Sequence, residues 1–306
     1  MVNKVAFIIS SGHSGSSLLS LILGSHPRCF SAGELKGLPN RYRKQVFIDC
    51  VNRNSEFWEN TFDQGGLKRL AIGLSGTRIH PYVPLKLESG IRDTLNKKDA
   101  YVNPYSYMFS KLDVDIIIDS SKAISWCEKR LKSPEFKHHR VEAYIIHLAR
   151  DGRAVVNSYL RKYPHRDIKD MSNEWSKKQL DRKEFCESFP AKKRIEVQYE
   201  ALASRPQETV AEICRFLDIE FRPEMLQYWL HNHHDISGNE GAYSLIDKYK
   251  GIEKERSMGS GKKKYYDASD LAIKLDLRWQ REMKPEYIEE FNRIAGEVNK
   301  PYEWDN

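Results

Sequence analysis

Residues 5–36, VAFIISSGHSGSSLLSLILGSHPRCFSAGELK, decide the fold of this chain. Val5 to Ile9 form a continuous apolar run, which is typical of a parallel strand buried on both faces. Ser10 to Ser17 are mostly small residues whose backbone N–H groups can point to one centre, and a helix is predicted to start near Ser16. A loop of this kind at a helix N-terminus binds a phosphate or a similar anion. We therefore expect the chain to bind a nucleotide-like ligand.

The loop lacks the pattern of an ordinary P-loop NTPase. That pattern needs a Gly, four residues and then Gly-Lys-Ser/Thr, with the Lys reaching the β- and γ-phosphates. Here Gly12 and Gly15 are too close together, and Gly15 instead of Lys precedes Ser16. The sequence thus predicts a phosphate-binding loop that is poorly suited to γ-phosphate chemistry.

A second block, IIHLARDGRAVVNS over residues 145–158, also indicates an anion site. Arg150 follows an apolar strand, and ligands of open α/β sheets bind at the carboxyl ends of strands. Its guanidinium can hold a terminal phosphate through two parallel charge-assisted hydrogen bonds. The alternative is a solvated turn in which Arg150, Asp151 and Arg153 pair with one another. We expect Asp151 and Arg153 to support the structure more than to touch a ligand.

The two blocks together resemble sulfotransferases that use 3′-phosphoadenosine-5′-phosphosulfate (PAPS). The loop HSGSSLL resembles their 5′-phosphosulfate loop, and RDGRA with a Ser eight residues after its first Arg resembles their 3′-phosphate site. The resemblance implies sulfuryl transfer from PAPS to an acceptor hydroxyl, with adenosine 3′,5′-bisphosphate as product and no metal. It also implies these donor-binding residues: Gly12, His13, Ser14, Gly15, Ser16, Ser17, Arg150, Ser158 and Tyr199, the last beside the adenine.

Glu34 is the predicted general base. Aligned through His26-Pro27, the segment is similar to the tyrosylprotein sulfotransferases, whose catalytic glutamate falls on Glu34. The alternative is a surface Glu that opens the next helix. Asp119 and Asp151 are lesser candidates for the base.

Positive charge at the transferred group is expected from His13 and Lys122. Relatives usually carry Arg or Lys where this chain has His13, and a histidine donates a hydrogen bond when protonated or from one nitrogen when neutral. There are two alternatives for His13: it acts as a base, or it is a loop residue that faces water. By the same resemblance Lys122 is the permanent cation, and Lys36 matches a basic position of the tyrosylprotein enzymes.

Alternating strands and helices predict an α/β, three-layer, P-loop-like fold with a central parallel sheet. Strands are expected over residues 113–119, 141–149 and 194–199, and an amphipathic helix over PQETVAEICRFLDI. We expect a single domain over residues 1–306, in which residues 37–110 form an acceptor-pocket and lid insertion.

Composition limits the remaining possibilities. The 306 residues carry a formal charge of +7, which suits an anionic ligand, and the five cysteines show no zinc or disulfide spacing. No apolar run is long enough for a membrane span and no signal peptide is evident, so we expect a cytoplasmic protein with reduced thiols. No nucleic-acid partner is expected. HNHHD near residue 231 is expected to line a pocket or lid, and Lys262–Lys264 are either phosphate contacts or a solvated run.

The sequence determines neither the acceptor nor the oligomeric state. A small molecule, a sugar, a lipid or a peptide hydroxyl would suit the same donor site. Two other classes also stay open: an ATP-dependent small-molecule kinase on a degenerate P-loop, and a nucleotide-binding module without catalysis.

Overall fold

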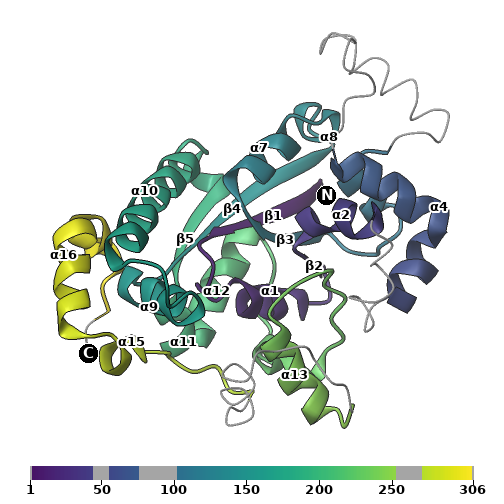
Figure 1. Cartoon of the computed structure of the whole chain (residues 1–306). Coiled ribbons are helices and arrows are strands. Elements are labelled where there is room, and N and C mark those ends of the chain that lie inside the picture. Colours follow the sequence, from purple (N-terminus) through teal and green to yellow (C-terminus); the bar gives the residue numbers. More distant parts are fainter. Residues whose placement is uncertain (1, 44–54, 76–101, 253–270, 305–306) are drawn as a thin grey trace. The chain divides into compact units, whose positions relative to one another are not determined.

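The computed structural model describes residues 2–43, 55–75, 102–252 and 271–304. Its five strands form a parallel sheet in the order β2-β3-β1-β4-β5, flanked by helices (Figure 1), which confirms the predicted fold class. The strands are β1 (Asn3–Ser10), β2 (Cys29–Gly33), β3 (Ile116–Lys122), β4 (Val141–Ala149) and β5 (Arg194–Gln198).

The strands form where the sequence is apolar on both sides of the backbone. Val5, Ala6 and Ile8 of β1 are fully buried, as are Ile116 to Ile118 of β3. Burial on both faces is what parallel strands covered by two helical layers require. The predicted strands over 141–149 and 194–199 are confirmed by β4 and β5. The strand predicted from residue 113 begins at Ile116 and continues to Lys122.

The contacts of the chain group into two compact units. Unit 1 comprises Met1–Phe7, Leu23–Tyr144 and His231–Gly238. Its core includes Phe7, which packs edge-on against Tyr105 with ring centroids 5.8 Å apart, and the stacked pair Trp58 and Phe62. Its helices are η1 (Leu35–Gly37), α2 (Leu38–Arg43), α4 (Ser55–Ser75), α6 (Pro104–Phe109), α7 (Ile124–Leu131) and α8 (Pro134–Lys137).

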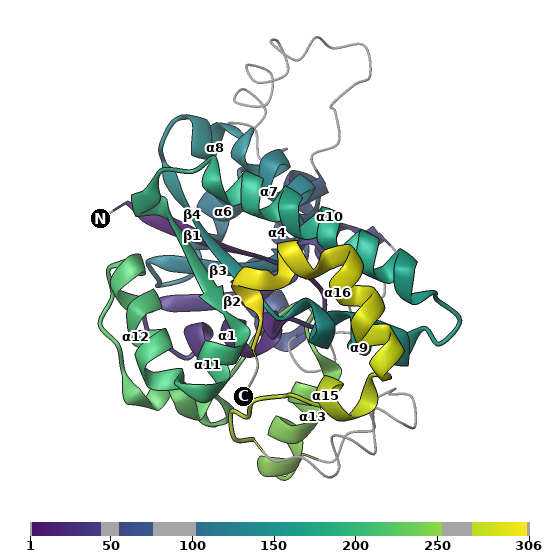
Figure 2. The same ribbon diagram turned by 90° about the vertical axis from the view of Figure 1, so that its left-hand side faces the viewer.

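Unit 2 comprises Ile8–Ile22, Ile145–Leu230 and Asn239–Asn306. Figure 2 shows its strands between α11 and α12 on one side and α10 and α16 on the other, and the core on the α10–α16 side centres on Trp175 and Phe291. The predicted amphipathic helix is α12, which buries Val210, Ile213, Cys214 and Leu217. The helices to which this unit contributes all or most residues are α1 (Ser16–Gly24), α9 (Gly152–Lys162), α10 (Ile168–Glu187), η2 (Ala191–Lys193), α11 (Tyr199–Ser204), α12 (Pro206–Leu217), η3 (Pro223–Leu230), α13 (Glu240–Tyr249), α15 (Trp279–Glu282), α16 (Pro285–Asn299) and η4 (Lys300–Tyr302).

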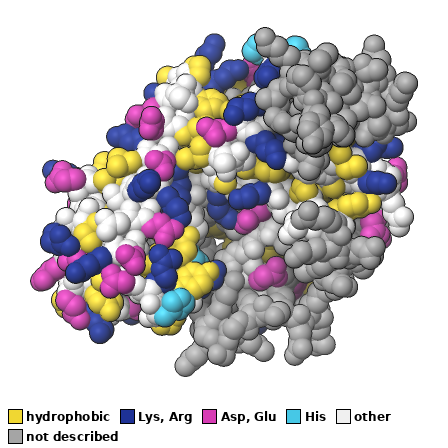
Figure 3. All heavy atoms as spheres, turned by 45° about the horizontal axis from the view of Figure 1, so that its top comes forward, with side chains coloured by type: hydrophobic (Ala, Val, Ile, Leu, Met, Phe, Trp, Pro, Cys, Tyr) yellow, Lys and Arg dark blue, Asp and Glu magenta, His cyan; other side chains and the backbone are white. Residues whose placement is uncertain are grey.

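Charged side chains of both signs lie on the face of the molecule that Figure 3 draws. On the face drawn in Figure 3, Lys and Arg side chains alternate with Asp and Glu. Cys29, Cys127, Cys186 and Cys214 are buried free thiols, and Cys50 lies outside the described residues. No helix in the described ranges combines the length and apolar character needed to cross a bilayer.

Candidate active site

The predicted anion loop lies in unit 2, between β1 and α1. Two of its residues have left-handed backbone conformations, His13 with φ 65° and Gly15 with φ 83°. Ser14 is fully buried and its hydroxyl is hydrogen-bonded to that of Ser11. Because α1 begins at Ser16, the amides of its first turn have no intrahelical acceptor and point to the loop. The loop thus has the geometry and the helix dipole of an anion site.

Both loop glycines lie against aromatic side chains. A Cβ on Gly12 would be 2.4 Å from the Tyr159 hydroxyl, and a Cβ on Gly15 would be 2.5 Å from the Tyr199 ring. Tyr159 also packs edge-on against His13, with ring centroids 4.9 Å apart. A side chain at either glycine would force the loop or the neighbouring tyrosine to shift. The sequence indicated no place at the loop for Tyr159.

Arg150 is in direct contact with the anion loop. Its Nη1 donates to the His13 carbonyl oxygen at 2.7 Å, and its guanidinium lies 4.3 Å from the centre of the Tyr199 ring. The structure therefore brings together the two predicted anion-binding elements, which are 137 residues apart in sequence. Arg150 is only 6% exposed, so its other donors also need partners.

Those partners are acidic. Nη2 donates to the Asp276 carbonyl oxygen at 2.8 Å and lies 3.2 Å from its Oδ2, while Nε lies 3.9 Å from Glu200 Oε1. Burial raises the pKa of Glu200 to about 7, an effect that Arg150 opposes. The pKa of Asp276 is lowered because hydrogen bonds from Arg278 and the charges of Arg150 and Arg278 outweigh the effect of burial. No local sequence pattern around Asp276 indicates this contact.

Asp151 and Arg153, which follow β4 and Arg150, stabilise the local structure through hydrogen bonds, as predicted. Asp151 is fully buried and caps α9 by accepting from the Arg153 amide at 2.9 Å. It also accepts from Arg153 Nη2, Asn299 Nδ2 and the Trp304 amide. With its oxygens occupied in this way, Asp151 is poorly placed to act as a base.

The side chains of Ser158 and Tyr199 both have hydrogen-bond partners within the protein. Ser158 is 8% exposed, in the second turn of α9, and its hydroxyl accepts from Arg161 Nη2 at 3.3 Å. The Tyr199 hydroxyl donates to the Lys274 carbonyl oxygen at 3.2 Å. Tyr199 is therefore a buried ring with a satisfied hydroxyl, covered on one face by Arg150.

Glu34 and Lys122 meet in unit 1 and form an ion pair, with a hydrogen bond from Lys122 Nζ to Glu34 Oε1. Their side chains are 35% and 22% exposed, so the pair can be reached by a ligand. Glu34 follows β2 and donates its amide to the Ser237 carbonyl oxygen at 3.2 Å. Lys122 ends β3 in a left-handed conformation with φ 67°. The sequence predicted both residues but not the strand that delivers Glu34.

Asp119 is a buried residue of β3, three positions before Lys122. It is 1% exposed and accepts from Tyr105 at 2.7 Å, from Trp126 at 2.8 Å and from the Ser121 amide at 2.9 Å. The Ser121 hydroxyl in turn accepts from the Lys36 amide at 3.0 Å. Asp119 thus fixes the end of β3 and η1, and it has no free face with which to act as the base.

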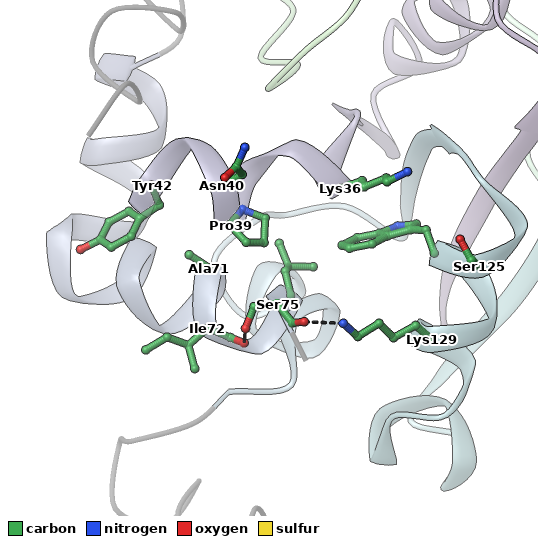
Figure 4. Close-up of a pocket in the computed structure, with 11 residues that line it drawn as sticks. Lys36, Pro39, Asn40, Tyr42, Ala71, Ile72, Ser75, Ser125 and Lys129 are labelled. Carbon is green, nitrogen blue, oxygen red and sulfur yellow. Dashed lines mark hydrogen bonds between the residues drawn. The ribbon is translucent and has the colours of Figure 1, made fainter. Parts of the chain in front are cut away.

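A cavity of about 660 Å³ lies in unit 1, next to these segments (Figure 4). Figure 4 shows α2, α4 and α7 around it. Its walls combine apolar side chains with two lysines, one of which, Lys129, donates to the Ser75 carbonyl oxygen. The lining residues are Lys36, Pro39, Asn40, Tyr42, Ala71, Ile72, Leu74, Ser75, Ser125, Trp126 and Lys129.

Other sequence features have structural settings of their own. His234 of the HNHHD segment stacks on Phe57 at 3.7 Å, and its carbonyl oxygen accepts from Trp58 Nε1 at 2.7 Å, so this segment packs on α4. Lys262–Lys264 and much of the 37–110 insertion lie outside the described residues. Within the described ranges, no three His, Cys, Asp or Glu side chains are arranged to hold a metal.

Comparison with known proteins shows similarity to sulfotransferases. A family model described as the sulfotransferase family matches residues 137–223, which include Arg150, Ser158 and Tyr199. A curated protein of Caenorhabditis briggsae named "Putative protein-tyrosine sulfotransferase" is 24% identical over 245 residues, covering 78% of this chain and 71% of that protein. The chain is similar to the sulfotransferase family over residues 137–223.

Two further comparisons give a relative that matches part of the chain and a solved structure with a similar fold. A Caenorhabditis elegans protein with the same name is 30% identical over 113 residues, covering 35% of this chain and 41% of that protein. The sulfotransferase domain of the Synechococcus PCC 7002 olefin synthase shares the fold, with a TM-score of 0.52 and 21% identity over 88% of this chain and 96% of that domain. The chain is thus related to tyrosylprotein sulfotransferases, and the predicted enzyme class is confirmed.

Proposed function

We propose that this sulfotransferase uses PAPS as donor and transfers its sulfuryl group to the hydroxyl of an acceptor. The observation that supports the donor most strongly is the hydrogen bond from Arg150 to the His13 carbonyl oxygen. It joins a loop suited to a 5′-phosphosulfate and an arginine suited to a 3′-phosphate within unit 2.

In the proposed mechanism the donor is bound by residues of unit 2. The amides of Gly15, Ser16 and Ser17 hold the 5′-phosphate, whose bond to sulfur breaks as the leaving group forms. Negative charge develops on the bridging oxygen, and His13 is proposed to donate a hydrogen bond to it. Arg150 and Ser158 bind the 3′-phosphate.

Unit 1 carries the residues proposed to act on the acceptor. Glu34 accepts the proton of the acceptor hydroxyl as its oxygen attacks sulfur in line. Lys122, which is hydrogen-bonded to Glu34, provides a permanent positive charge for the transferring group. Because the pair is partly exposed, an acceptor hydroxyl can replace the ammonium at the carboxylate.

The cavity of Figure 4 is proposed to hold the body of the acceptor. Lys36 belongs to the helix that follows Glu34, and Trp126 belongs to the helix that follows Lys122. One wall of the cavity therefore continues from each of the two catalytic candidates. The curated relatives are named protein-tyrosine sulfotransferases, so a peptide tyrosine is the first acceptor to test.

The test is transfer of label from ³⁵S-labelled PAPS to a panel of tyrosine peptides, sugars, lipids and small phenols. We expect labelled product from at least one class and none from boiled protein. Release of phosphate from ATP with magnesium, and no transfer from PAPS, would support the kinase alternative instead. Binding of adenosine 3′,5′-bisphosphate without any transfer would support a binding module.

A further inference from the structure

The guanidinium of Arg150 is already paired with a carboxylate of the protein, that of Asp276. Nη2 makes both a hydrogen bond to the Asp276 carbonyl oxygen, at 2.8 Å, and an ion pair with its carboxylate, at 3.2 Å. Nη1 is committed to His13 O, and only Nε has no hydrogen-bond partner among the described residues. A phosphate approaching Arg150 therefore meets a donor set that is largely occupied.

The Asp276 carboxylate is firmly held at this place. Its oxygens also accept from Arg278 Nε at 2.7 Å and from Arg278 Nη2 at 2.8 Å, a bidentate pair. The Asp276 side chain is 16% exposed, so water does little to screen its charge from Arg150. Carboxylate and phosphate are read by the same planar fork of a guanidinium. Asp276 therefore presents to Arg150 the chemistry that a terminal phosphate would present.

We propose that Asp276 is an internal competitor of the nucleotide 3′-phosphate, and that it sets the affinity of the donor site. This proposal rests on the proposed role of Arg150 in binding that phosphate. A ligand with a 3′-phosphate must exchange the Asp276 carboxylate for its own oxygens at Nη2. Arg278 keeps its bidentate hold on the displaced carboxylate, so the exchange leaves no buried charge unpaired. A nucleotide with a free 3′-hydroxyl requires no exchange.

Competition of this kind lowers the affinity for substrate and product alike. The bisphosphate product carries the same 3′-phosphate as the donor, and return of the Asp276 carboxylate to Arg150 would help to release it. The cost of freeing Arg150 reduces the apparent affinity in the way that any unfavourable pre-equilibrium does. Asp276 is thus a determinant of affinity that lies outside the loop and strand-end motifs.

The test is Asp276→Asn, which keeps the shape and the carbonyl contact but removes the charge. Calorimetric titration should show adenosine 3′,5′-bisphosphate bound roughly tenfold more tightly than by the unchanged protein. Adenosine 5′-monophosphate, which lacks the 3′-phosphate, should bind equally well to both. As a matched control, Glu174→Gln removes another Arg-paired carboxylate, from α10, and should change neither affinity.

The outcomes separate this proposal from the proposed function. Weaker or unchanged binding of the bisphosphate by folded Asp276→Asn would overturn the competitor role and would make Asp276 a support of Arg150. Failure of the unchanged protein to distinguish the bisphosphate from the monophosphate would instead overturn the 3′-phosphate site itself. A circular dichroism melt of each variant establishes that the compared proteins are folded.

Discussion

Glu34 is the residue on which the proposed chemistry most depends. Of the three candidate carboxylates, Glu34 is the one exposed enough to meet an acceptor, since Asp119 and Asp151 are buried and saturated with hydrogen bonds. Glu34→Gln keeps the size of the side chain and a partner for Lys122 but cannot take a proton. We expect turnover to fall by about 10²–10⁴-fold, with little change in bisphosphate affinity. Radiolabel transfer and calorimetry measure the two effects, and undiminished turnover would remove the base assignment.

Arg150 is the corresponding residue for the donor. Arg150→Lys keeps a positive charge opposite Asp276 and Glu200, so the fold is preserved better than with Ala, but the planar fork is lost. We expect adenosine 3′,5′-bisphosphate to bind about 10–100-fold more weakly, the range for a lost hydrogen bond to a charged group. Adenosine 5′-monophosphate serves as the control ligand in the same titration. Equal weakening for both ligands would mean that Arg150 holds the loop and not the phosphate.

The loop between β1 and α1 is the element whose shape is most constrained. Gly15 has φ 83°, and an added Cβ would be 2.5 Å from the Tyr199 ring. Gly15→Ala should therefore lower the free energy of unfolding by about 1–3 kcal/mol and weaken nucleotide binding. Urea denaturation and calorimetry provide the measurements.

Gly296 in α16 offers a matched control for that substitution. A Cβ there meets nothing closer than Asn292 at 3.9 Å. Gly296→Ala should raise the free energy of unfolding by about 0.5–1 kcal/mol, because alanine loses less backbone entropy in a helix. If Gly15→Ala behaved like Gly296→Ala, the loop would not need its left-handed residue.

Elements with a long apolar run could be predicted from the sequence, and short or polar ones could not. β1 and β4 could be predicted because each contains a run of aliphatic residues, which the structure buries. β2 is only Cys29–Gly33, five buried residues of which two are Ser and Gly, and no periodic pattern marks it. The end of β3 is likewise polar: Ser120 and Ser121 are buried there, and Ser121 donates to Asp119, although serine has little preference for strands.

The candidate site also has a part that could be predicted from contiguous motifs and a part that depends on contacts between residues distant in sequence. The anion loop and the Arg150 block are contiguous in sequence, so their chemistry could be predicted from motif and strand position. The contact of Arg150 with Asp276 joins residues 126 positions apart, and no local pattern encodes it. Glu34 and Lys122 were each predicted through resemblance, but their pairing, which joins residues 88 positions apart, was not predicted. Contacts that form only when the chain folds could not be predicted from the sequence alone.

For the molecule as a whole, buried carboxyls set how stability depends on pH. Burial raises the pKa of Glu135 from 4.5 to about 7, against the hydrogen bonds that its carboxyl accepts from the Ser106 amide and the Ser133 hydroxyl. Between these two values the folded chain keeps a proton at Glu135 that the unfolded chain has lost. The contribution of this group to the free energy of unfolding is therefore fully present below pH 4.5 and is lost as the pH rises through about 7.

Glu135→Gln isolates this contribution, because a neutral amide in the same place does not titrate. We expect the unfolding free energy of the variant, relative to the unchanged protein, to rise by up to about 3 kcal/mol between pH 4.5 and 7.5, from a shift of about 2.5 pKa units. Urea denaturation at several pH values measures the difference. Glu212→Gln, an exposed position on α12, should give a difference that hardly changes with pH. A flat difference for Glu135→Gln as well would mean that the buried carboxyl is ionised throughout, with its charge compensated by Arg130, which is buried in the same unit.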